Sequence, residues 1–237
     1  MRRRPRLPPE ELAPYVLETA PPGPPGAAPA PAPLDWRAVF GNGRPVEIEV
    51  GFGKGLFLLT ESADRPEVNY LGIEIERKYQ LFTATRLAKR DRPNVRVACA
   101  DARLFLRQRV PAGSVRAVHV YFPDPWWKKR HHKRRVFTPE FVAEVARVLT
   151  PGGRLLAASD VPEYAAVIAE LVPAHTSLRP LPPPAEHEPE HDLDYLTNYE
   201  RKFRRQGKAI NRLSYELPAG PSGEGLAVSA PEGPSAG

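Results

Sequence analysis

The sequence predicts one α/β domain, in which a parallel sheet is covered by helices on both faces. The first observation is that apolar strand-like segments alternate with helix-like segments along most of the 237 residues. The second is that the connections between them are short, as in sheets built from repeated strand–helix units. The third is a glycine-rich loop directly after a strand, where such sheets bind ligands.

The expected strands are short, apolar and bounded by turn residues. They lie at 46–50, 70–75, 95–100, 115–122, about 154–158 and about 209–215. The expected helices lie at 56–62, 77–90, 102–109, 139–149 and 162–171. Leu81, Ala84 and Ala88 share a helical face, and Thr138 before Pro139 predicts an N-cap with proline at the first helical position.

Segments rich in proline and glycine mark the limits of this domain. Residues 21–33 are only Pro, Gly and Ala, which predicts an extended linker. The residues after Leu217 have the composition of a disordered tail. We therefore expect an N-terminal arm at 1–20, a linker at 21–33, the main domain at 34–217 and a tail at 218–237.

Charge and composition narrow the classes of partner. The formal net charge of +6 favours a polyanion. Cys99 is the single cysteine, which excludes an intramolecular disulfide or a cysteine zinc site and fits a reducing compartment. No apolar run has membrane-spanning length, and the basic start lacks the apolar core of a secretory signal. We expect a cytoplasmic protein without a membrane partner, and homo-oligomerisation stays open.

The glycine loop EVGFGKG carries Gly51, Gly53 and Gly55 directly after the strand at 46–50. Glycines there permit a tight turn and let a ligand approach the backbone. A dinucleotide fingerprint needs another glycine where this chain has Leu56, so the spacing favours an adenosyl ligand without a pyrophosphate. An ordinary strand-to-helix turn is the alternative.

Carboxylates end or follow three of the expected strands. Glu74 lies about 20 residues past the glycine loop, where an acidic residue accepts from ribose hydroxyls; Glu76 is the alternative. Asp101 either caps the next helix or accepts from the adenine exocyclic amine, and the two roles are compatible. Glu49 lies in a strand buried on both faces, where a charge needs a partner such as the α-ammonium of methionine.

The most specific segment is FPDPWWKKRHHKRR, at 122–135. Prolines on both sides of Asp124 hold it in a stiff, non-helical turn at the end of an apolar strand. Lys, Arg and His fill all eight positions from 128 to 135. A run of charged residues is usually only a solvent-exposed surface. Here the run follows Trp126 and Trp127, so cations that can bind phosphate lie beside rings that can stack on bases. This combination predicts nucleic-acid binding.

Three further motifs have structural alternatives. Asp160 either caps the helix beginning near Pro162 or contacts a ligand. Thr197 and Glu200 fit a capping box, T-x-x-E, ahead of a basic run at 201–208. The segment HEPEH at 187–191 fits the H-E-x-x-H zinc pattern, but a proline between the histidines opposes the helix that this site needs, so no metal is expected.

The chain resembles the bacterial tRNA (guanine-N7)-methyltransferases over about 47–217. The resemblance rests on EVGFGKG, LGIEIE, FPDPWWKKRHHKRR, LTPGGRLLAASD and TNYERKFRRQGKAINRL. It implies a class I S-adenosylmethionine-dependent methyltransferase fold, Rossmann-like, with a seven-stranded, mostly parallel sheet. It also implies methyl transfer from S-adenosyl-L-methionine to N7 of a guanine in tRNA, at position 46 of the variable loop.

The resemblance implies a role for individual residues. The cofactor contacts, including the glycine loop, are Glu49, Gly51, Gly53, Gly55, Glu74, Asp101 and Asp124. The substrate contacts are Lys128, Asp160, Thr197, Asn198, Tyr199 and Glu200. The RNA contacts are Arg130, His131, His132, Lys133, Arg134 and Arg135. The arm, linker and tail fall outside the resemblance, so it implies nothing about them.

Asp124 is the expected catalytic residue. Guanine N7 has an exposed lone pair, so the enzyme's task is alignment rather than deprotonation. Asp124 either orients the guanine and balances the charge of the methylated ring, or contacts mainly the cofactor. Trp126 or Trp127 stacks on an unstacked base or packs in the core. The basic aromatic segment opposes a methyltransferase of proteins or small molecules, and the intact loop and carboxylates oppose a noncatalytic RNA-binding module.

Overall fold

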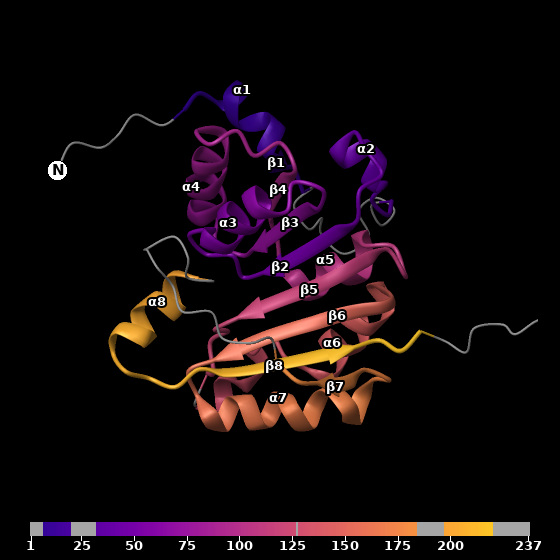
Figure 1. The fold of residues 1–237 in the computed structure, drawn as a ribbon, viewed down its shortest axis with the longest axis vertical. Helices are drawn as coiled ribbons and strands as arrows, with labels where there is room; N and C mark the ends of the chain where they lie inside the picture. Colours follow the sequence, from indigo (N-terminus) through magenta and orange to yellow (C-terminus); the bar gives the residue numbers. More distant parts are fainter. Residues whose placement is uncertain (1–6, 20–31, 127, 184–196, 220–237) are drawn as a thin grey trace, which may run out of the picture.

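The strands form one mixed, mostly parallel sheet. The computed structural model describes residues 7–19, 32–126, 128–183 and 197–219, apart from the side chains of Lys129 and His132. Within these residues the eight strands follow the order β1-β4-β3-β2-β5-β6-β8-β7 (Figure 1). They are β1 (Val16–Leu17), β2 (Val46–Val50), β3 (Asn69–Glu74), β4 (Val95–Cys99), β5 (Val115–Tyr121), β6 (Leu149–Ser159), β7 (Arg179–Leu181) and β8 (Asn211–Glu216). β1 to β6 pair in parallel, and β8 runs antiparallel to β6 and β7.

Helices follow most of the strands. They are α1 (Pro9–Leu12), η1 (Ala13–Tyr15), α2 (Trp36–Phe40), α3 (Leu56–Asp64), α4 (Arg77–Ala88), α5 (Ala102–Arg109), η2 (Lys129–Arg134), α6 (Pro139–Val148), α7 (Pro162–His175) and α8 (Asn198–Arg205). The expected start of α6 is confirmed, because the Thr138 hydroxyl accepts from the Phe141 amide at 3.2 Å. No helix in the described part of the chain is long and apolar enough to cross a membrane.

Apolar side chains pack against both faces of the sheet. Ile73 of β3 belongs to a buried cluster with residues of α5, α6 and α7, whereas Tyr70 of the same strand packs with η1, α3 and α4. Because side chains alternate along a strand, these clusters lie on opposite faces. Ile48 and Val50 belong to the first cluster, so Glu47 and Glu49 of β2 point to the face that α3 covers.

The sheet has one strand more than the seven that the resemblance implies, because the arm contributes β1. Val16 and Leu17 pair with Val97 and Ala98 of β4. Leu12 and Tyr15, just before β1, are buried in the cluster with α3 and α4. Residues of the arm therefore belong to the sheet, and two residues among prolines are too few to show the strand pattern in the sequence.

Smaller differences concern short or irregular elements. The sequence pattern does not predict α2 or β7, which have only five and three residues. β6 begins at Leu149, before the Pro-Gly-Gly turn, because Leu149 already pairs with Val115 across a bulge in β5. Positions 20–31, Trp127, the HEPEH segment and the tail from 220 lie outside the described residues.

The strand order reverses at β2, which places the candidate site. β3 and β4 continue the sheet on one side of β2, and β5 and β6 on the other. Open parallel sheets bind ligands beyond the carboxyl ends of the strands at such a switch point. The glycine loop follows β2 and the turn at 122–126 follows β5, so both segments lie at this position.

Candidate functional site

Acidic residues lie at or just after the carboxyl ends of five neighbouring parallel strands. In spatial order across the sheet, these residues are Asp101 after β4, Glu74 on β3, Glu49 on β2, Asp124 after β5 and Asp160 after β6. Since parallel strands end at the same edge, the fold collects on one edge residues that are far apart in the sequence.

The glycine loop has the backbone that its glycines predict. Gly51, Gly53 and Gly55 have φ angles of +78°, +50° and +66°, in the left-handed region that favours glycine. A Cβ on Gly55 would lie 2.3 Å from Cγ2 of Thr83, so a side chain there is excluded by space as well. Thr83 also donates to the Gly53 carbonyl at 3.3 Å. Nothing in the sequence links this threonine of α4 to the loop.

Glu74 holds the glycine loop in place. Its Oε2 accepts from the Gly53 amide at 3.0 Å, and its Oε1 accepts from the amides of Ile75 and Glu76 at 2.8 and 3.1 Å. A carboxylate has about four acceptor positions, so capacity remains for a hydroxyl. Glu76 instead is exposed and pairs with Lys78 at 3.1 Å. The geometry favours Glu74 over Glu76 for binding at this edge.

Glu49 is a buried carboxylate with an open oxygen. The residue is 3% exposed, and its Oε2 has no hydrogen-bond partner among the described residues. Burial, and then the charges of Glu74 and Glu61, raise the pKa of Glu49 well above its usual range. A bound cation would relieve both effects, because it supplies a donor and an opposite charge.

Glu47, two residues earlier on the same face of β2, has the opposite environment. It accepts from both Arg65 terminal nitrogens at 3.0 and 2.8 Å and lies 2.9 Å from Nε2 of His119. Burial raises its pKa, but the hydrogen bonds and charges of His119 and Arg65 outweigh burial and lower it to about 2. Glu47 is not among the residues expected at the site, although the alternation VEIEV places it on the same face of the strand as Glu49.

Asp101 caps α5, as one of its two interpretations predicted. Its Oδ1 accepts from the Arg103 amide at 2.9 Å, and its Oδ2 lies 2.7 Å from Nη2 of Arg103. The hydrogen bond from the Arg103 guanidinium is the main cause that lowers the pKa of Asp101. The residue is therefore ionised and remains an acceptor. Arg103 also donates to the Lys133 carbonyl at 3.2 Å, which joins α5 to η2.

The turn at 122–126 is strained on both sides of Asp124. Phe122 and Trp126 have φ angles of +53° and +44°, and Asp91 is the third non-glycine residue with positive φ in the described chain. Bulky residues in this region cost about 1 to 3 kcal/mol each. The turn is held by a 2.8 Å hydrogen bond from the Phe122 amide to the Ala158 carbonyl. Asp124 is exposed, and no described residue donates to its carboxylate.

Aromatic rings join this turn to a basic element at each end. Phe122 packs against Tyr199 and Phe203 of α8, with ring centroids 6.2 and 5.4 Å apart. At the other end, Trp126 contacts the His131 ring at 5.7 Å and lies under the Arg134 guanidinium at 4.9 Å. The turn that carries Asp124 therefore lies between α8 and η2.

The basic residues at 128–135 differ in their exposure to solvent. Lys128, Arg130, Lys133 and Arg134 are exposed. Arg135 instead donates to the Pro125 carbonyl at 2.7 Å and lies over the Tyr164 ring at 5.0 Å. The guanidinium of Arg135 thus supports the turn directly. Trp127 and the His132 side chain lie outside what the structure describes.

Thr197 and Asp160 were each expected as possible helix N-caps, and only Thr197 is one. The Thr197 hydroxyl accepts from the Glu200 amide at 3.0 Å, so Thr197 is the N-cap of α8, as the capping-box interpretation predicted. The helix-cap interpretation of Asp160 is wrong. The N-cap residue of α7 is Val161, and Asp160 instead lies 3.2 Å from Nζ of Lys208.

Two of the expected substrate contacts, Tyr199 and Glu200, lie at the start of α8, and they differ in exposure. Tyr199 is 53% exposed. Burial first, and then Tyr79, Asp124 and Glu74, raise the pKa of Tyr199, so this residue is within electrostatic reach of the acidic edge. Glu200 is buried and pairs with Arg204 at 3.0 Å and with Arg212. Glu200 therefore holds α8 against β8, and Tyr199 faces the site.

The described acidic residues of this edge do not form a metal-binding cluster. In the part of the chain that the structure describes, no three His, Cys, Asp or Glu side chains lie together in a way that could hold a metal ion. The HEPEH segment lies outside that part. The site therefore consists of carboxylates, backbone amides and aromatic rings, with basic side chains around it.

Comparison with known proteins gives consistent matches. The model of a family described as a putative methyltransferase matches residues 43–213. A tRNA (guanine-N(7)-)-methyltransferase of Rhodopirellula baltica is 46% identical over 78% of this chain and 70% of its own length. A protein of the same name from Geobacter metallireducens is 39% identical over 79% of this chain and 89% of its own length.

Solved structures share the fold at much lower identity. The crystal structure of the 16S rRNA methyltransferase KamB is 18% identical, with a TM-score of 0.58 over 77% of this chain and 92% of that one. An S-adenosylmethionine-dependent methyltransferase from Aquifex aeolicus has a TM-score of 0.51 and 13% identity over 73% of this chain and 82% of that one. The expected Rossmann-like methyltransferase fold is thus confirmed.

Proposed function

Because this chain belongs to the tRNA (guanine-N7)-methyltransferase family, we propose that it transfers a methyl group from S-adenosyl-L-methionine to N7 of a guanine in tRNA. One observation of the structure carries the proposal. The carboxylates of Glu49, Glu74 and Asp101 lie along one sheet edge with the glycine loop, and Asp124 lies next to them between two basic elements. We further propose position 46 as the target and the cytoplasm as the place of action.

The residues present suit an adenosyl cofactor with an amino-acid tail. The open Oε2 of buried Glu49 would accept from the α-ammonium group. The remaining acceptor capacity of Glu74 would serve the ribose hydroxyls, and Asp101 would accept from the adenine amine. Gly51 and Gly53 have open space where a Cβ would lie, so a ligand can approach their backbone. When bound, the cofactor supplies an electrophilic methyl group on a sulfonium.

Asp124 acts on the guanine in this proposal. Its carboxylate projects from a turn whose flanking residues are strained and whose carbonyl at Pro125 is fixed by Arg135. A rigid acceptor can orient the Watson–Crick edge of the base. Its negative charge also offsets the positive charge that the purine ring gains when N7 is methylated, and this stabilisation grows toward the transition state. No general base is needed, because N7 carries no proton to remove.

The side chains around the turn would position the RNA. Exposed Lys128, Arg130, Lys133 and Arg134 would bind backbone phosphates, and Tyr199 and Asn198 at the start of α8 would contact the nucleoside. His131 and His132 would extend the same contact. Thr197, Glu200 and Asp160 are tied within the fold, so their contribution to substrate binding is to position α8.

The test is methyl transfer from radiolabelled S-adenosylmethionine to an unmodified tRNA transcript, followed by nucleoside analysis. We expect label in 7-methylguanosine, and none when adenine replaces guanine at position 46 of the transcript. Label in another nucleoside would contradict the N7 assignment. If the substituted transcript still gives labelled 7-methylguanosine, the N7 methylation is supported but the assignment of position 46 is overturned.

A further inference from the structure

Arg103, in the first turn of α5, contacts both the candidate cofactor site and the basic element η2. Its Nε donates to Oδ1 of Asp101 at 3.2 Å, and its Nη2 donates to Oδ2 at 2.7 Å. Its Nη1 donates to the Lys133 carbonyl at 3.2 Å. A guanidinium is planar and carries its donors in a fixed arrangement. The contacts of one side chain therefore set the position of Asp101 relative to the backbone of η2.

The helix itself does not favour an arginine at this position. A cation in the first turn of a helix is opposed by the positive end of the helix dipole. The other basic residues of α5, Arg107 and Arg109, lie in its last turn, where the dipole favours a cation. The hydrogen bonds of Arg103 to Asp101 and Lys133 offset this unfavourable position.

On the cofactor side, Arg103 restricts the carboxylate of Asp101. The carboxylate accepts from the Arg103 amide at 2.9 Å, and the guanidinium binds side-on across both of its oxygens. A carboxylate that cannot rotate presents its remaining acceptor capacity in one direction. In the proposed function this capacity serves the exocyclic amine of adenine. Arg103 would then determine how well the site distinguishes adenine from a purine without that amine.

On the RNA side, Arg103 holds the end of η2 that carries exposed cations. Lys133 and Arg134 are exposed, and the Arg134 guanidinium lies over the Trp126 ring at 4.9 Å. Trp126 belongs to the turn that carries Asp124. The end of η2 is thus held by α5 through the Lys133 carbonyl and by the turn through Arg134. Cations on an element held in this way bind phosphates at a lower cost in conformational entropy than cations on a mobile segment.

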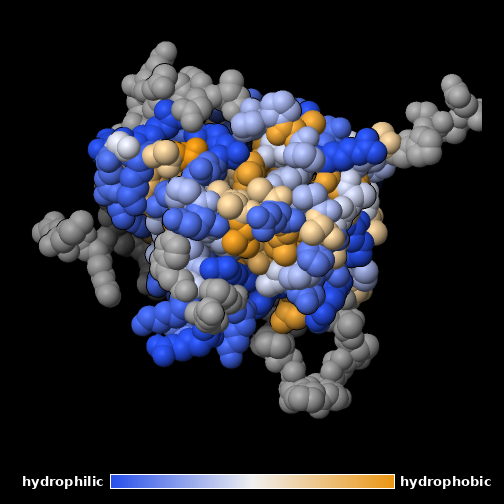
Figure 2. Space-filling view, turned by 90° about the horizontal axis from the view of Figure 1, so that it is seen from below, coloured by the Kyte–Doolittle hydropathy of each residue, from blue (hydrophilic) through white to orange (hydrophobic). Residues whose placement is uncertain are grey.

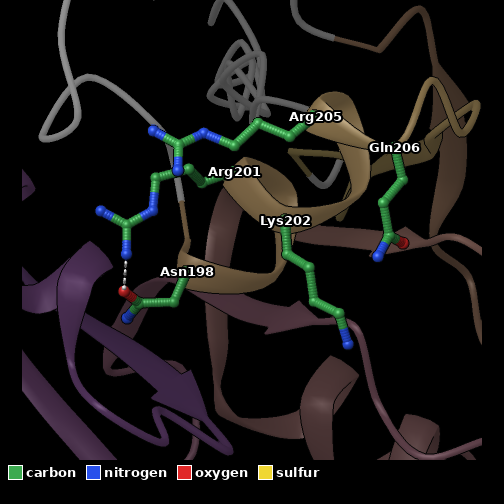
Figure 3. Close-up of a pocket in the computed structure, with 5 residues that line it drawn as sticks. All are labelled: Asn198, Arg201, Lys202, Arg205 and Gln206. Carbon is green, nitrogen blue, oxygen red and sulfur yellow. Dashed lines mark hydrogen bonds between the residues drawn. The ribbon is translucent and has the colours of Figure 1, made fainter.

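The opposite end of the acidic edge has a related arrangement. Asp160, after β6, lies 3.2 Å from Nζ of Lys208, which follows the basic helix α8. Figure 3 shows side chains of α8 and Gln206 that line a hollow of about 320 Å³, where Asn198 accepts from Arg201 at 3.2 Å. Hydrophilic side chains gather on the left of Figure 2, the side on which α8 lies in Figure 1. The outermost carboxylate at each end of the edge is thus paired with a cation that joins it to a basic element.

We infer that Arg103 is a positioning residue for both substrates of the reaction: it directs Asp101 toward the amine of adenine and holds η2 where its cations meet the RNA backbone. The inference rests on the proposed function and deepens it. In this role Arg103 contacts neither adenine nor RNA and acts through the residues that it holds. A lysine would keep the charge, but its single ammonium group lacks the planar fork that bonds both oxygens of Asp101 and the Lys133 carbonyl. The inference therefore requires the geometry of Arg103 and not only its charge.

The experiment compares Arg103→Ala and Arg103→Lys with the wild-type chain. The matched control is Arg107→Ala, which removes an exposed cation one turn further along α5. Calorimetry measures the affinity for S-adenosylhomocysteine and for S-inosylhomocysteine, in which an oxygen replaces the exocyclic amine. The dissociation constant of an unmodified tRNA transcript is measured for each chain, and urea unfolding checks that the fold is retained.

The wild-type chain and the control should bind S-adenosylhomocysteine at least about tenfold more tightly than S-inosylhomocysteine, as one hydrogen bond to a charged acceptor predicts. Both Arg103 variants should lose most of this preference and should bind the tRNA transcript several-fold more weakly. A merely structural change would weaken the binding of both nucleosides alike and leave their ratio unchanged. Because Arg103→Lys keeps the charge, its loss of tRNA affinity would report the position of η2.

Wild-type behaviour of both Arg103 variants, while the wild-type chain methylates tRNA, would overturn the inference and leave the proposed function intact. Wild-type behaviour of Arg103→Lys alone would show that the charge is sufficient, and this result also overturns the inference. Loss of only the adenine preference, or of only the tRNA affinity, would overturn the claim that one residue acts on both sites. If the wild-type chain transfers no methyl group to tRNA, the inference and the proposed function are both overturned.

Discussion

Glu74 at the end of β3 accepts a hydrogen bond from the Gly53 amide at 3.0 Å. A residue of β3 therefore fixes the glycine loop that follows the neighbouring strand β2. The carboxylate also accepts from the amides of Ile75 and Glu76. All three donors belong to backbone that surrounds the candidate cofactor site. Glu74 therefore shapes the loop before any ligand binds to it.

Replacing Glu74 with glutamine should weaken both the loop and cofactor binding. The amide nitrogen of Gln cannot accept, so at least one backbone donor loses its partner, at a cost of about 1 to 3 kcal/mol. S-adenosylmethionine affinity should fall at least tenfold in calorimetric titration. Glu76→Gln is the control, because Glu76 is exposed and pairs with Lys78. Equal losses in the two variants would contradict the role of Glu74.

Glu49→Gln should stabilise the ligand-free protein at neutral pH and weaken cofactor binding. The folded pKa of Glu49 is raised above the unfolded value of about 4.5, so the wild type loses stability as pH rises above 4.5. Glutamine removes this loss. At pH 7 the variant should therefore be more stable than the wild type. Urea unfolding at pH 5 and pH 7, with calorimetry for the cofactor, checks both parts. A variant less stable than wild type at pH 7 would refute the argument.

Glu47→Gln should have the opposite effect on stability. The folded pKa of Glu47 is about 2, below the unfolded value of about 4.5, so its stabilisation is present above pH 4.5 and is lost as pH falls toward 2. At pH 7 the variant should lose about 1 to 3 kcal/mol, because Arg65 and His119 lose a charged acceptor. Unfolding free energies measured between pH 2.5 and pH 7 should converge with wild type at the acid end. A constant difference over this range would count against the assignment.

Gly55→Ala should destabilise the protein more than Gly51→Ala. Both glycines have positive φ, and alanine there costs about 1 to 2 kcal/mol. A Cβ on Gly55 also collides with Thr83, whereas one on Gly51 has nothing within 4 Å. Adding Thr83→Ala to Gly55→Ala should recover the steric part of the loss. Chemical denaturation of the three variants measures these differences, and no recovery in the double variant would show that the collision is not the cause.

Asp124→Asn should reduce turnover with tRNA without changing the fold. Loss of one transition-state charge contact costs about 100-fold to 1000-fold in kcat. The carboxylate is exposed and no described residue donates to it, so the unfolding free energy should change by less than about 0.5 kcal/mol. Glu170→Gln, an exposed carboxylate of α7, serves as the control. Near-normal turnover of Asp124→Asn would remove Asp124 from the mechanism.

The main strands of the sheet, the glycine loop and the start of α6 were predictable because their signals are local. The strand at 46–50, its glycine loop and the helix start at Thr138 depend on neighbouring residues, and the structure confirms them. β1 was not predictable, since two residues carry no periodicity and their pairing with β4 crosses about 80 residues of chain. Long-range pairing of this kind leaves no trace in one sequence.

The partners of the site residues were the part that sequence reasoning could not supply. That Glu47 is saturated by Arg65 and His119 while Glu49 is open depends on α3 and β5 meeting β2. Likewise, the sequence around Asp160 is compatible with a helix cap, but in the structure Asp160 pairs with Lys208 instead. The sequence shows which residue types follow each strand. Which side chains pair with them depends on the tertiary structure.

The pairing of β1 also bears on how the molecule behaves at high concentration. Without it, β4 would be the outermost strand on that side and would display a row of unsatisfied amides and carbonyls. Such a row is a template onto which other chains can add, and it leads to aggregation. The two residues of β1 cover part of this row and are too short to extend it further. A chain truncated before Leu34 should therefore precipitate at lower concentrations than the full chain, even where methyl transfer is retained.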